Sequence, residues 1–197
     1  MGAVMLTGAT GFVGRELLTR FLERDDRHVY ALVRAPDDEA AAARLPRHER
    51  LTAVAADIER PGLGLTDARA DALADEVTTV IHCAASVSFG LGLEESRRVN
   101  VEGTRRIAEL AERCAALERF TYISTAYVAG AHRGLFREDD LDVGQDFRNA
   151  YELSKFEAER LMRERYAHLP LQVLRPDHLP RLSSARCQED SPGQEVL

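Results

Sequence analysis

The sequence predicts an α/β protein built on a doubly wound parallel sheet. Three observations favour this fold class. Short apolar segments alternate with amphipathic helical segments through most of the chain. The short segments are apolar throughout, which is typical of strands that are buried on both faces. A glycine-rich turn joins the first apolar segment to the first helical one, as in open sheets that bind ligands at the carboxyl ends of their strands.

The alternation predicts six strands and five helices. The strands are expected at Ala3 to Thr7, Val29 to Val33, Leu51 to Ala55, Val77 to Ala84, Phe120 to Thr125 and Leu171 to Leu174. The helices are expected at Val13 to Arg24, Glu39 to Leu45, Ala68 to Leu73, Glu94 to Ala115 and Ala150 to Arg165. In the first helix, apolar residues from Val13 to Leu22 recur on one stripe, so this helix is expected to pack on the sheet.

Length and composition favour one domain. The chain has 197 residues, of which 45% are hydrophobic and 30% are charged, enough for one sizeable core. We expect a single domain over residues 1–176. From Asp177 the sequence loses apolar periodicity and gathers Pro, Ser, Gly and charge, which predicts an irregular, poorly ordered tail over residues 177–197.

Charge and cysteine content exclude several classes of partner. A net charge of −7 disfavours nucleic acid and anionic membranes, because both are bound through excess Lys and Arg. No apolar run approaches a membrane span and no leader pattern is evident, so we expect a cytoplasmic protein. Cys83, Cys114 and Cys187 lack paired ligand spacing, so we expect reduced thiols and no metal site.

The first strand leads directly into a dinucleotide-binding turn. The turn has the pattern TGxxGxxG and comprises Thr7, Gly8, Ala9, Thr10, Gly11, Phe12, Val13 and Gly14. Gly8 permits the tight turn, Gly11 lets the backbone approach a pyrophosphate, and Gly14 lets the helix pack closely on the strand. The helix N-terminus adds unpaired N–H groups and a favourable dipole. We therefore expect binding of NAD(P) in a Rossmann-like fold.

Residues after the next three strands are expected to contact the cofactor, and Arg34 among them indicates NADP(H) rather than NAD(H). Arg34 follows the second strand, where NAD-preferring domains usually carry a carboxylate, and its guanidinium matches a 2′-phosphate. The alternative is a solvated arginine at a strand end. Asp57 and Ile58 follow the third strand, where the carboxylate is expected to accept from the adenine amino group. Ala84 and Ala85 follow the fourth strand, where small side chains let the cofactor lie close.

Tyr151 and Lys155 form a YxxxK pair on an expected helix, one turn apart on the same face. A nearby ammonium is expected to lower the tyrosine pKa, so that the phenol exchanges a proton with a substrate oxygen. Thr125 is expected to hydrogen-bond the substrate carbonyl, with Ser124 as the alternative, because successive strand residues face opposite ways. Asn100 is expected to brace the lysine through water; the alternative is an asparagine bonded to nearby backbone.

A series of segments resembles the extended short-chain dehydrogenase/reductase superfamily from about Ala3 to Pro176: TGATGFVG, LVRA, AADIERPGLGLT, VIHCAASVSF, NVEGT, FTYISTAYVAG and NAYELSK. They are more similar to fatty acyl-CoA and thioester reductases than to nucleotide-sugar epimerases. The resemblance implies that Thr125, Tyr151 and Lys155 are catalytic. It also implies that the cofactor is contacted by Gly8, Gly11, Gly14, Arg34, Asp57 and Ala84.

The resemblance implies an NADPH-dependent oxidoreductase that reduces the carbonyl of an aldehyde or of an acyl thioester on CoA or a carrier protein, with a homodimer as a further possibility. Two alternatives stay open: a nucleotide-sugar epimerase or dehydratase, and a catalytically silent NADP(H)-binding remnant. The remnant alternative arises because the superfamily continues past the Arg175-Pro176 pair into a substrate-binding subdomain that this sequence lacks. The sequence therefore resembles a shortened member of the superfamily.

Overall fold

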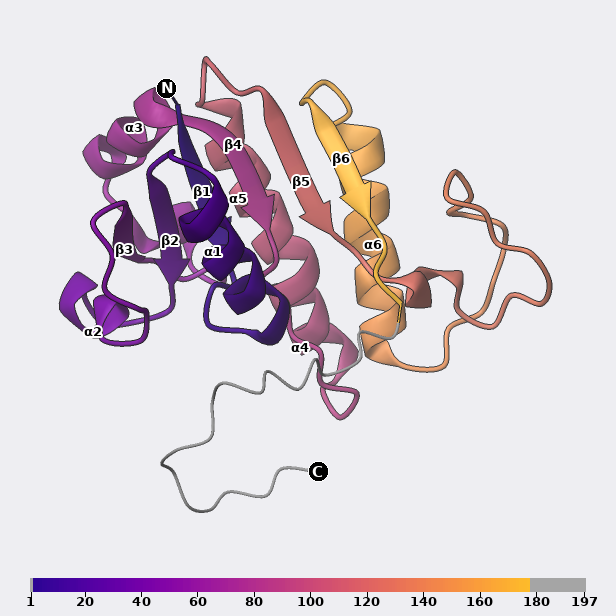
Figure 1. The fold of residues 1–197 in the computed structure, drawn as a ribbon. Coiled ribbons are helices and arrows are strands. Elements are labelled where there is room, and N and C mark those ends of the chain that lie inside the picture. The colour runs from indigo at the N-terminus through magenta and orange to yellow at the C-terminus, as the bar shows by residue number, and fades with distance from the viewer. Residues whose placement is uncertain (1, 178–197) are drawn as a thin grey trace.

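The computed structural model describes residues 2–177, and its six strands form one parallel sheet (Figure 1). The strands are β1 (Ala3–Thr7), β2 (Val29–Val33), β3 (Leu51–Ala55), β4 (Val77–His82), β5 (Arg119–Ile123) and β6 (Leu171–Leu174). Their order is β3-β2-β1-β4-β5-β6. β1 pairs with β2 on one side and with β4 on the other, which is the topological switch point where open α/β sheets bind ligands. The predicted doubly wound parallel sheet is confirmed.

Helices pack on both faces of this sheet. They are α1 (Phe12–Arg24), α2 (Asp38–Ala42), α3 (Asp67–Glu76), α4 (Leu93–Arg97), α5 (Gly103–Glu112) and α6 (Ala150–Arg165). Alternate residues of β1 enter different cores: Val4 and Leu6 pack with Leu18 of α1, whereas Met5 packs with residues of α3, α5 and α6. α1 accordingly lies on the opposite face from α5 and α6 (Figure 1). This alternation explains why the strands read as continuous apolar runs.

Two strands end earlier than predicted. β4 ends at His82, two residues before Ala84, because the next two backbone N–H groups donate to the Thr7 hydroxyl. β5 ends at Ile123 because Thr125 caps a short 3-10 turn, η3 (Ala126–Ala129). Side-chain hydrogen bonds therefore end both strands. An apolar sequence pattern gives no sign of such bonds, so it predicts strands that are too long. A second short turn, η1 (Pro61–Gly64), follows β3.

The long helix predicted from Glu94 to Ala115 is present as a continuous helical stretch from Leu93 to Glu112, but it is not a uniform α-helix and it ends three residues earlier. The chain forms α4, then a π-helical turn, η2 (Arg98–Glu102), and then α5. Asn100 lies buried in this turn, and its backbone carbonyl accepts a hydrogen bond of 2.6 Å from the Thr104 hydroxyl. π-helical turns inside helices are frequent at functional sites, and this one brings the Asn100 side chain beside α6 through a bond to Ser154.

Two further expectations concern the chain as a whole. Within residues 2–177, no helix has the length and apolarity required to cross a membrane. Cys114 is buried and Cys83 is partly buried, and both are free thiols. Cys187 and the tail predicted from Asp177 onward, Asp177 itself excepted, lie outside the described residues.

Candidate active and cofactor-binding site

The turn after β1 is packed too tightly for side chains at two of its glycines. Gly8 has a φ of 73°, a conformation that L side chains rarely adopt. A Cβ at Gly14 would lie 2.1 Å from the Gly8 carbonyl oxygen, so α1 begins directly against the turn. The predicted tasks of these two glycines, the tight turn and the close helix packing, match this geometry. The N-terminal N–H groups of α1 are thereby aimed at the space beyond β1.

Thr7 ties this turn to the end of β4. Its hydroxyl accepts from the backbone N–H groups of Cys83 and Ala84, both at 3.1 Å, and lies 2.7 Å from His82 Nδ1. His82 Nε2 lies 3.0 Å from the Thr104 hydroxyl, whose proton goes to Asn100. Nε2 is therefore the donor and Nδ1 accepts from Thr7. Burial lowers the pKa of His82 to about 3, so the ring is neutral at physiological pH.

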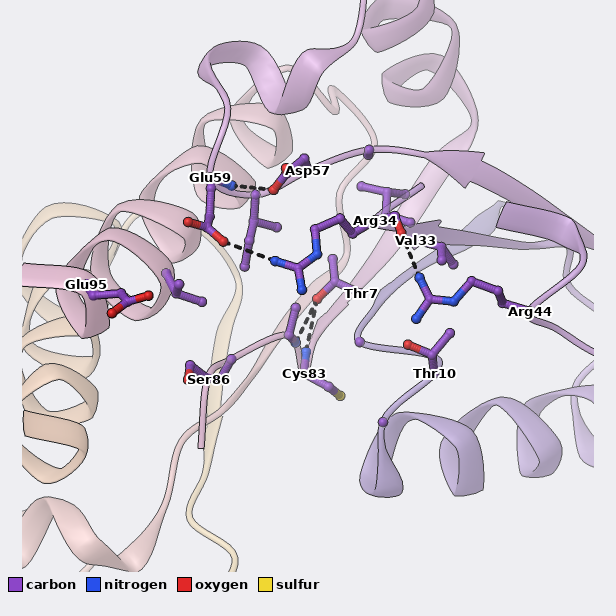
Figure 2. Close-up of a pocket in the computed structure, with 18 of the residues that line it drawn as sticks. Thr7, Thr10, Val33, Arg34, Arg44, Asp57, Glu59, Cys83, Ser86 and Glu95 are labelled. Carbon is purple, nitrogen blue, oxygen red and sulfur yellow. Dashed lines mark hydrogen bonds and ion pairs between the residues drawn. The ribbon is translucent and has the colours of Figure 1, made fainter. Parts of the chain in front are cut away.

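A cavity of about 470 Å³ opens at the carboxyl ends of β1 to β4 (Figure 2). It is large enough to hold much of a dinucleotide. The cavity brings together most of the predicted cofactor-binding residues: Thr7, Gly8, Thr10, Gly11, Arg34, Asp57, Ile58, Ala84 and Ala85. Phe12, Val13 and Gly14 on α1, and Tyr151 and Lys155 on α6, are not among the residues that line it.

Two charged residues that the sequence analysis missed lie at the Arg34 end of this cavity. Arg44 lines it and donates to the Arg34 carbonyl at 2.6 Å, and Glu59 accepts from the Arg34 guanidinium at 3.1 Å (Figure 2). The Arg34 side chain is still 74% exposed. A phosphate group in this corner would meet two guanidinium groups. No periodicity marks Arg44, because only the fold brings the segment after α2 back to the end of β2.

Asp57 lies at the cavity wall, but one of its carboxylate oxygens is already in use. Oδ1 accepts from the Glu59 backbone N–H at 2.9 Å, which forms a local turn of the kind that Asp commonly makes. The same turn carries Glu59 toward Arg34. Asp57 therefore shapes the cavity corner, and its predicted contact with an adenine amino group stays a prediction.

α6 presents Tyr151 and Lys155 to the sheet, both buried. The helix begins at Ala150 because the Asn149 side chain caps it, accepting from Glu152 N at 2.9 Å. Lys155 Nζ donates to the Ile123 carbonyl at 2.8 Å. Lys155 is the only lysine of the chain, whose other 25 basic side chains are arginine. Burial lowers the pKa of Lys155 to about 7, a shift that a guanidinium does not undergo.

The structure separates Thr125 from its alternative, Ser124. The Ser124 hydroxyl donates to Glu159 at 2.6 Å. Thr125 faces the other way, toward Tyr151, whose pKa its hydroxyl lowers; the same hydroxyl oxygen accepts from the Tyr127 backbone N–H at 3.2 Å. Thr125 and Tyr151 are therefore the pair of hydroxyl groups that the fold brings together at this sheet edge.

The expected lowering of the Tyr151 pKa is wrong for this structure. Burial raises the pKa of Tyr151, and this outweighs the opposing effect of the Thr125 hydroxyl. Burial removes water that would otherwise stabilise the phenolate. The Lys155 ammonium is directed at the Ile123 carbonyl rather than at the phenol, so the i, i+4 spacing alone did not determine the shift.

Asn100 does not bond directly to Lys155. Its amide nitrogen donates to the Ser154 hydroxyl at 2.9 Å and to the Ser86 carbonyl at 3.1 Å, and its oxygen accepts from Ser86 N at 2.8 Å. The alternative, an asparagine bonded to nearby backbone, accounts for two of these contacts. Asn100 thus joins the loop after β4 to α6, next to Tyr151 and Lys155, and its role toward the lysine stays a prediction.

Two aromatic side chains that the sequence analysis missed surround Tyr151. The ring centroid of Phe89 lies 5.4 Å from that of Tyr151, and Tyr127 lies 6.4 Å from it. Phe89 is 59% exposed. Phe89 lies in the loop after β4 and Tyr127 lies in η3, so no shared pattern in the sequence marks the two residues as neighbours. Together they form an apolar margin around the Tyr151 phenol.

Comparison with known proteins agrees with this geometry. Residues 6–185 match the family described as Male sterility protein, so the match continues past Pro176. A carboxylic acid reductase of Segniliparus rugosus is 35% identical over 205 aligned residues, covering 88% of this chain and 17% of the relative. The terminal R domain from the myxalamid PKS-NRPS pathway superposes with a TM-score of 0.82 at 34% identity, covering 90% of this chain and 49% of that one.

A protein that binds a sugar nucleotide and NAD shares the fold with a lower TM-score. MoeE5, in complex with UDP-glucuronic acid and NAD, superposes with a TM-score of 0.67 at 29% identity, covering 87% of this chain and 52% of that one. The chain thus spans about half of the solved structures and a smaller part of the carboxylic acid reductase. The family match and the reductase relatives place the branch: the chain belongs to the Male sterility protein family of the extended short-chain dehydrogenases/reductases, which are NAD(P)-dependent oxidoreductases.

Proposed function

We propose that this chain is the cofactor-binding and catalytic part of an NADPH-dependent reductase. Its substrate is an aldehyde or an acyl thioester carried on CoA or on a carrier protein. The observation that carries the proposal is the placement of Thr125, Tyr151 and Lys155, all buried, at the carboxyl end of β5, along the same sheet edge as the cavity. Two hydroxyl donors at one point suit a carbonyl oxygen that gains negative charge.

The charges around the cavity support NADPH over NADH. Arg34 and Arg44 lie at the same corner, and Arg34 now pairs with the Glu59 carboxylate. A 2′-phosphate carries more negative charge than a carboxylate and offers more acceptor oxygens. It is therefore expected to compete successfully for the Arg34 guanidinium. The cofactor, when bound, supplies the hydride for the carbonyl carbon.

The remaining chemistry belongs to side chains of this chain. Thr125 and Tyr151 donate hydrogen bonds to the developing oxyanion. The raised pKa of Tyr151 keeps the phenol protonated near neutrality, which suits a donor. With a thioester, collapse of the tetrahedral adduct breaks the C–S bond, and the thiolate leaves with an aldehyde as product. With an aldehyde, the Tyr151 proton passes to the alkoxide and an alcohol forms.

Sugar-nucleotide chemistry is the second candidate, because MoeE5 shares the fold and 29% of the aligned residues. Two observations favour the reductase. The relative with the higher TM-score is an R domain, and a carboxylic acid reductase is 35% identical. The exposed aromatic margin of Phe89 and Tyr127 also suits an acyl chain better than a polar sugar.

The test is NADPH consumption by the purified chain with a panel of acyl-CoAs and aldehydes. We expect turnover with at least one, and a loss of about a hundredfold or more in Tyr151→Phe, which removes one proton donor. Tyr30→Phe is the matched control, because its hydroxyl bonds Glu76 far along the sheet. Sugar-nucleotide turnover without net NADPH loss would favour the second candidate. Tight NADPH binding without any turnover would favour the silent remnant.

A further inference from the structure

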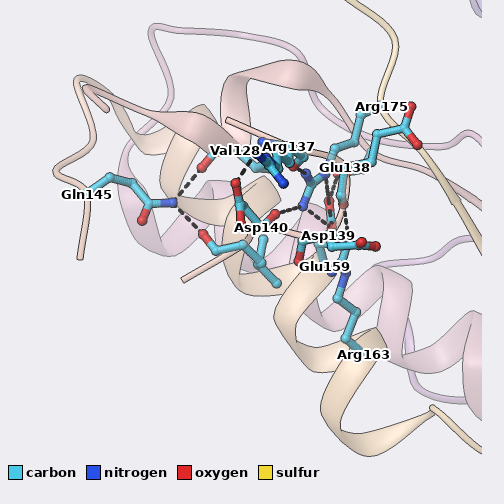
Figure 3. Close-up of polar contacts among 11 residues, drawn as sticks. Val128, Arg137, Glu138, Asp139, Asp140, Gln145, Glu159, Arg163 and Arg175 are labelled. Carbon is cyan, nitrogen blue, oxygen red and sulfur yellow. Dashed lines mark hydrogen bonds and ion pairs between the residues drawn. The ribbon is translucent and has the colours of Figure 1, made fainter. Parts of the chain in front are cut away.

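Glu159 is a fully buried carboxylate one helical turn beyond Lys155 on α6. It has three partners: the Ser124 hydroxyl at 2.6 Å, Arg163 at 2.8 Å and Arg175 at 2.7 Å. Figure 3 shows both arginines converging on it. An isolated buried charge is strongly unfavourable, so a buried carboxylate normally persists only where such partners hold it. Here they fix its orientation as well as its charge.

The two arginines also hold the segment that leads into α6. Arg175 donates to the backbone carbonyls of Arg137 and Asp140, at 3.2 and 2.6 Å. Arg163 donates to those of Glu138 and Asp139, at 3.0 and 3.1 Å (Figure 3). The carboxylate therefore lies at a junction of β5, the end of β6 and this segment. Contacts from all three of these elements fix the position of the Glu159 carboxylate relative to α6.

Lys155 faces titratable groups from three elements. Tyr151 and Glu159 lie on its own helix, Tyr122 lies on β5, with its ring centroid 4.4 Å from Nζ, and His82 and Cys83 lie at the end of β4. His82 is neutral. Burial raises the pKa of the Cys83 thiol to about 12 and also raises that of both tyrosines. Of these named groups, Glu159 is the carboxylate, and it forms ion pairs with Arg163 and Arg175.

We propose that Glu159 is a positioning residue of this site, the built counter-charge that keeps the side chain of Lys155 in its ammonium form beside Tyr151. The effect of Glu159 on Lys155 does not depend on the proposed function. Only the catalytic use of the ammonium rests on it. The placement of Glu159 carries the inference: the carboxylate is buried one turn from Lys155 on the same helix, and it accepts from Ser124, the residue next to Ile123, whose carbonyl accepts from Lys155 Nζ. Arg163 and Arg175 hold the carboxylate there. A carboxylate that does not act on Lys155 through its charge would leave the protonation of Lys155 unchanged when neutralised.

The single lysine allows a direct test. Growth with ¹³C-labelled lysine labels one side chain, so the Cε resonance reports the charge of Lys155 without further assignment. In the wild-type chain we expect a titration midpoint near pH 7, the pKa to which burial lowers Lys155. Glu159→Gln keeps the side-chain shape and removes the charge. It is expected to lower the midpoint by about one pH unit, because the interior screens charges weakly.

Matched variants separate charge from packing. Ser124→Ala removes a hydrogen bond to the carboxylate and leaves its charge, so the Lys155 midpoint is expected to stay within about 0.3 pH unit of wild type. If Glu159→Gln does not fold, the charge-balanced pair Glu159→Gln with Arg163→Gln is compared with Arg163→Gln alone, and the same downward shift is expected. An unmoved midpoint in either comparison, or an equal shift in Ser124→Ala, overturns the inference.

The outcome is independent of turnover. The titration needs neither cofactor nor substrate, so failure of the proposed reductase reaction would leave the Lys155 midpoints unaffected. A second readout is NADPH binding as a function of pH. If the Lys155 ammonium contributes to NADPH binding, the affinity decreases as rising pH removes its proton. In Glu159→Gln this decrease is expected at a lower pH than in wild type. A charge effect moves the midpoint of that profile, whereas a packing defect lowers affinity equally at all pH values.

Discussion

The Thr7 hydroxyl and the His82 ring are joined by a buried hydrogen bond of 2.7 Å between Oγ1 and Nδ1. This bond connects β1, which carries the glycine turn, to β4, whose end forms the opposite wall of the cavity. His82 continues the connection through Nε2 to Thr104 on α5. A neutral imidazole with one donor and one acceptor suits both partners.

Replacing His82 by leucine is expected to reduce the free energy of unfolding by about 1–3 kcal/mol, because Thr7 and Thr104 each lose a buried partner.

The free energy of unfolding of the wild-type chain is also expected to fall as the pH drops below about 6.5. The unfolded chain then gains a proton at His82, whereas the folded ring, with its pKa lowered to about 3, does not. Urea unfolding at several pH values measures both effects. His132→Leu, at an exposed histidine, is the control. An acid slope that is unchanged in His82→Leu would contradict this account.

Gly14→Ala is expected to destabilise the chain by about 1–3 kcal/mol and to weaken NADPH binding, since a methyl group would overlap the Gly8 carbonyl. Gly92→Ala is the matched control, because nothing lies within 4 Å of a Cβ there. Thermal unfolding and calorimetric titration with NADPH check both variants. If Gly14→Ala matches Gly92→Ala both in stability and in affinity for NADPH, the close contact between α1 and the turn is not required.

Arg34→Ala and Arg44→Ala are each expected to weaken NADPH binding about 10- to 100-fold and to leave NADH binding nearly unchanged. Each removes charge-assisted hydrogen bonds to a 2′-phosphate that NADH lacks. Arg47→Ala is a control on the same segment, at an exposed arginine that does not line the cavity. Calorimetry with both dinucleotides supplies the measurement. Equal losses for NADPH and NADH would argue against selection through this corner.

The free energy of unfolding is expected to rise by about 2–3 kcal/mol between pH 7 and 9 through Lys155. Burial lowers the folded pKa of this group to about 7, so the unfolded chain binds the extra proton and loses it as the pH rises. Above about pH 9 the partly buried Cys83 thiol, with its raised pKa, opposes the trend. Lys155→Met should remove the rise. A slope shared by wild type and Lys155→Met would mean that other groups cause it.

Local sequence was sufficient for the fold class and for the order of the strands and helices. Strand periodicity, the spacing of Gly8, Gly11 and Gly14, and the order of segments up to Tyr151 and Lys155 depend on residues close together in the chain. Most of the predicted cofactor residues accordingly line one cavity, because parallel strands deliver their carboxyl ends to a common edge. Apolar patterns predict the type and order of the elements because each strand or helix must bury its own apolar residues.

Only the tertiary structure decided how the polar groups are partnered. The early end of β4, the bond from Asn100 to Ser154, the bond from Ser124 to Glu159 and the contact of Arg44 with the end of β2 all depend on residues that are not neighbours in the sequence. The rise in the Tyr151 pKa likewise reflects burial rather than spacing. Hydrogen bonds and desolvation are determined by three-dimensional neighbours, so the chemistry of this site follows from packing that no local pattern encodes.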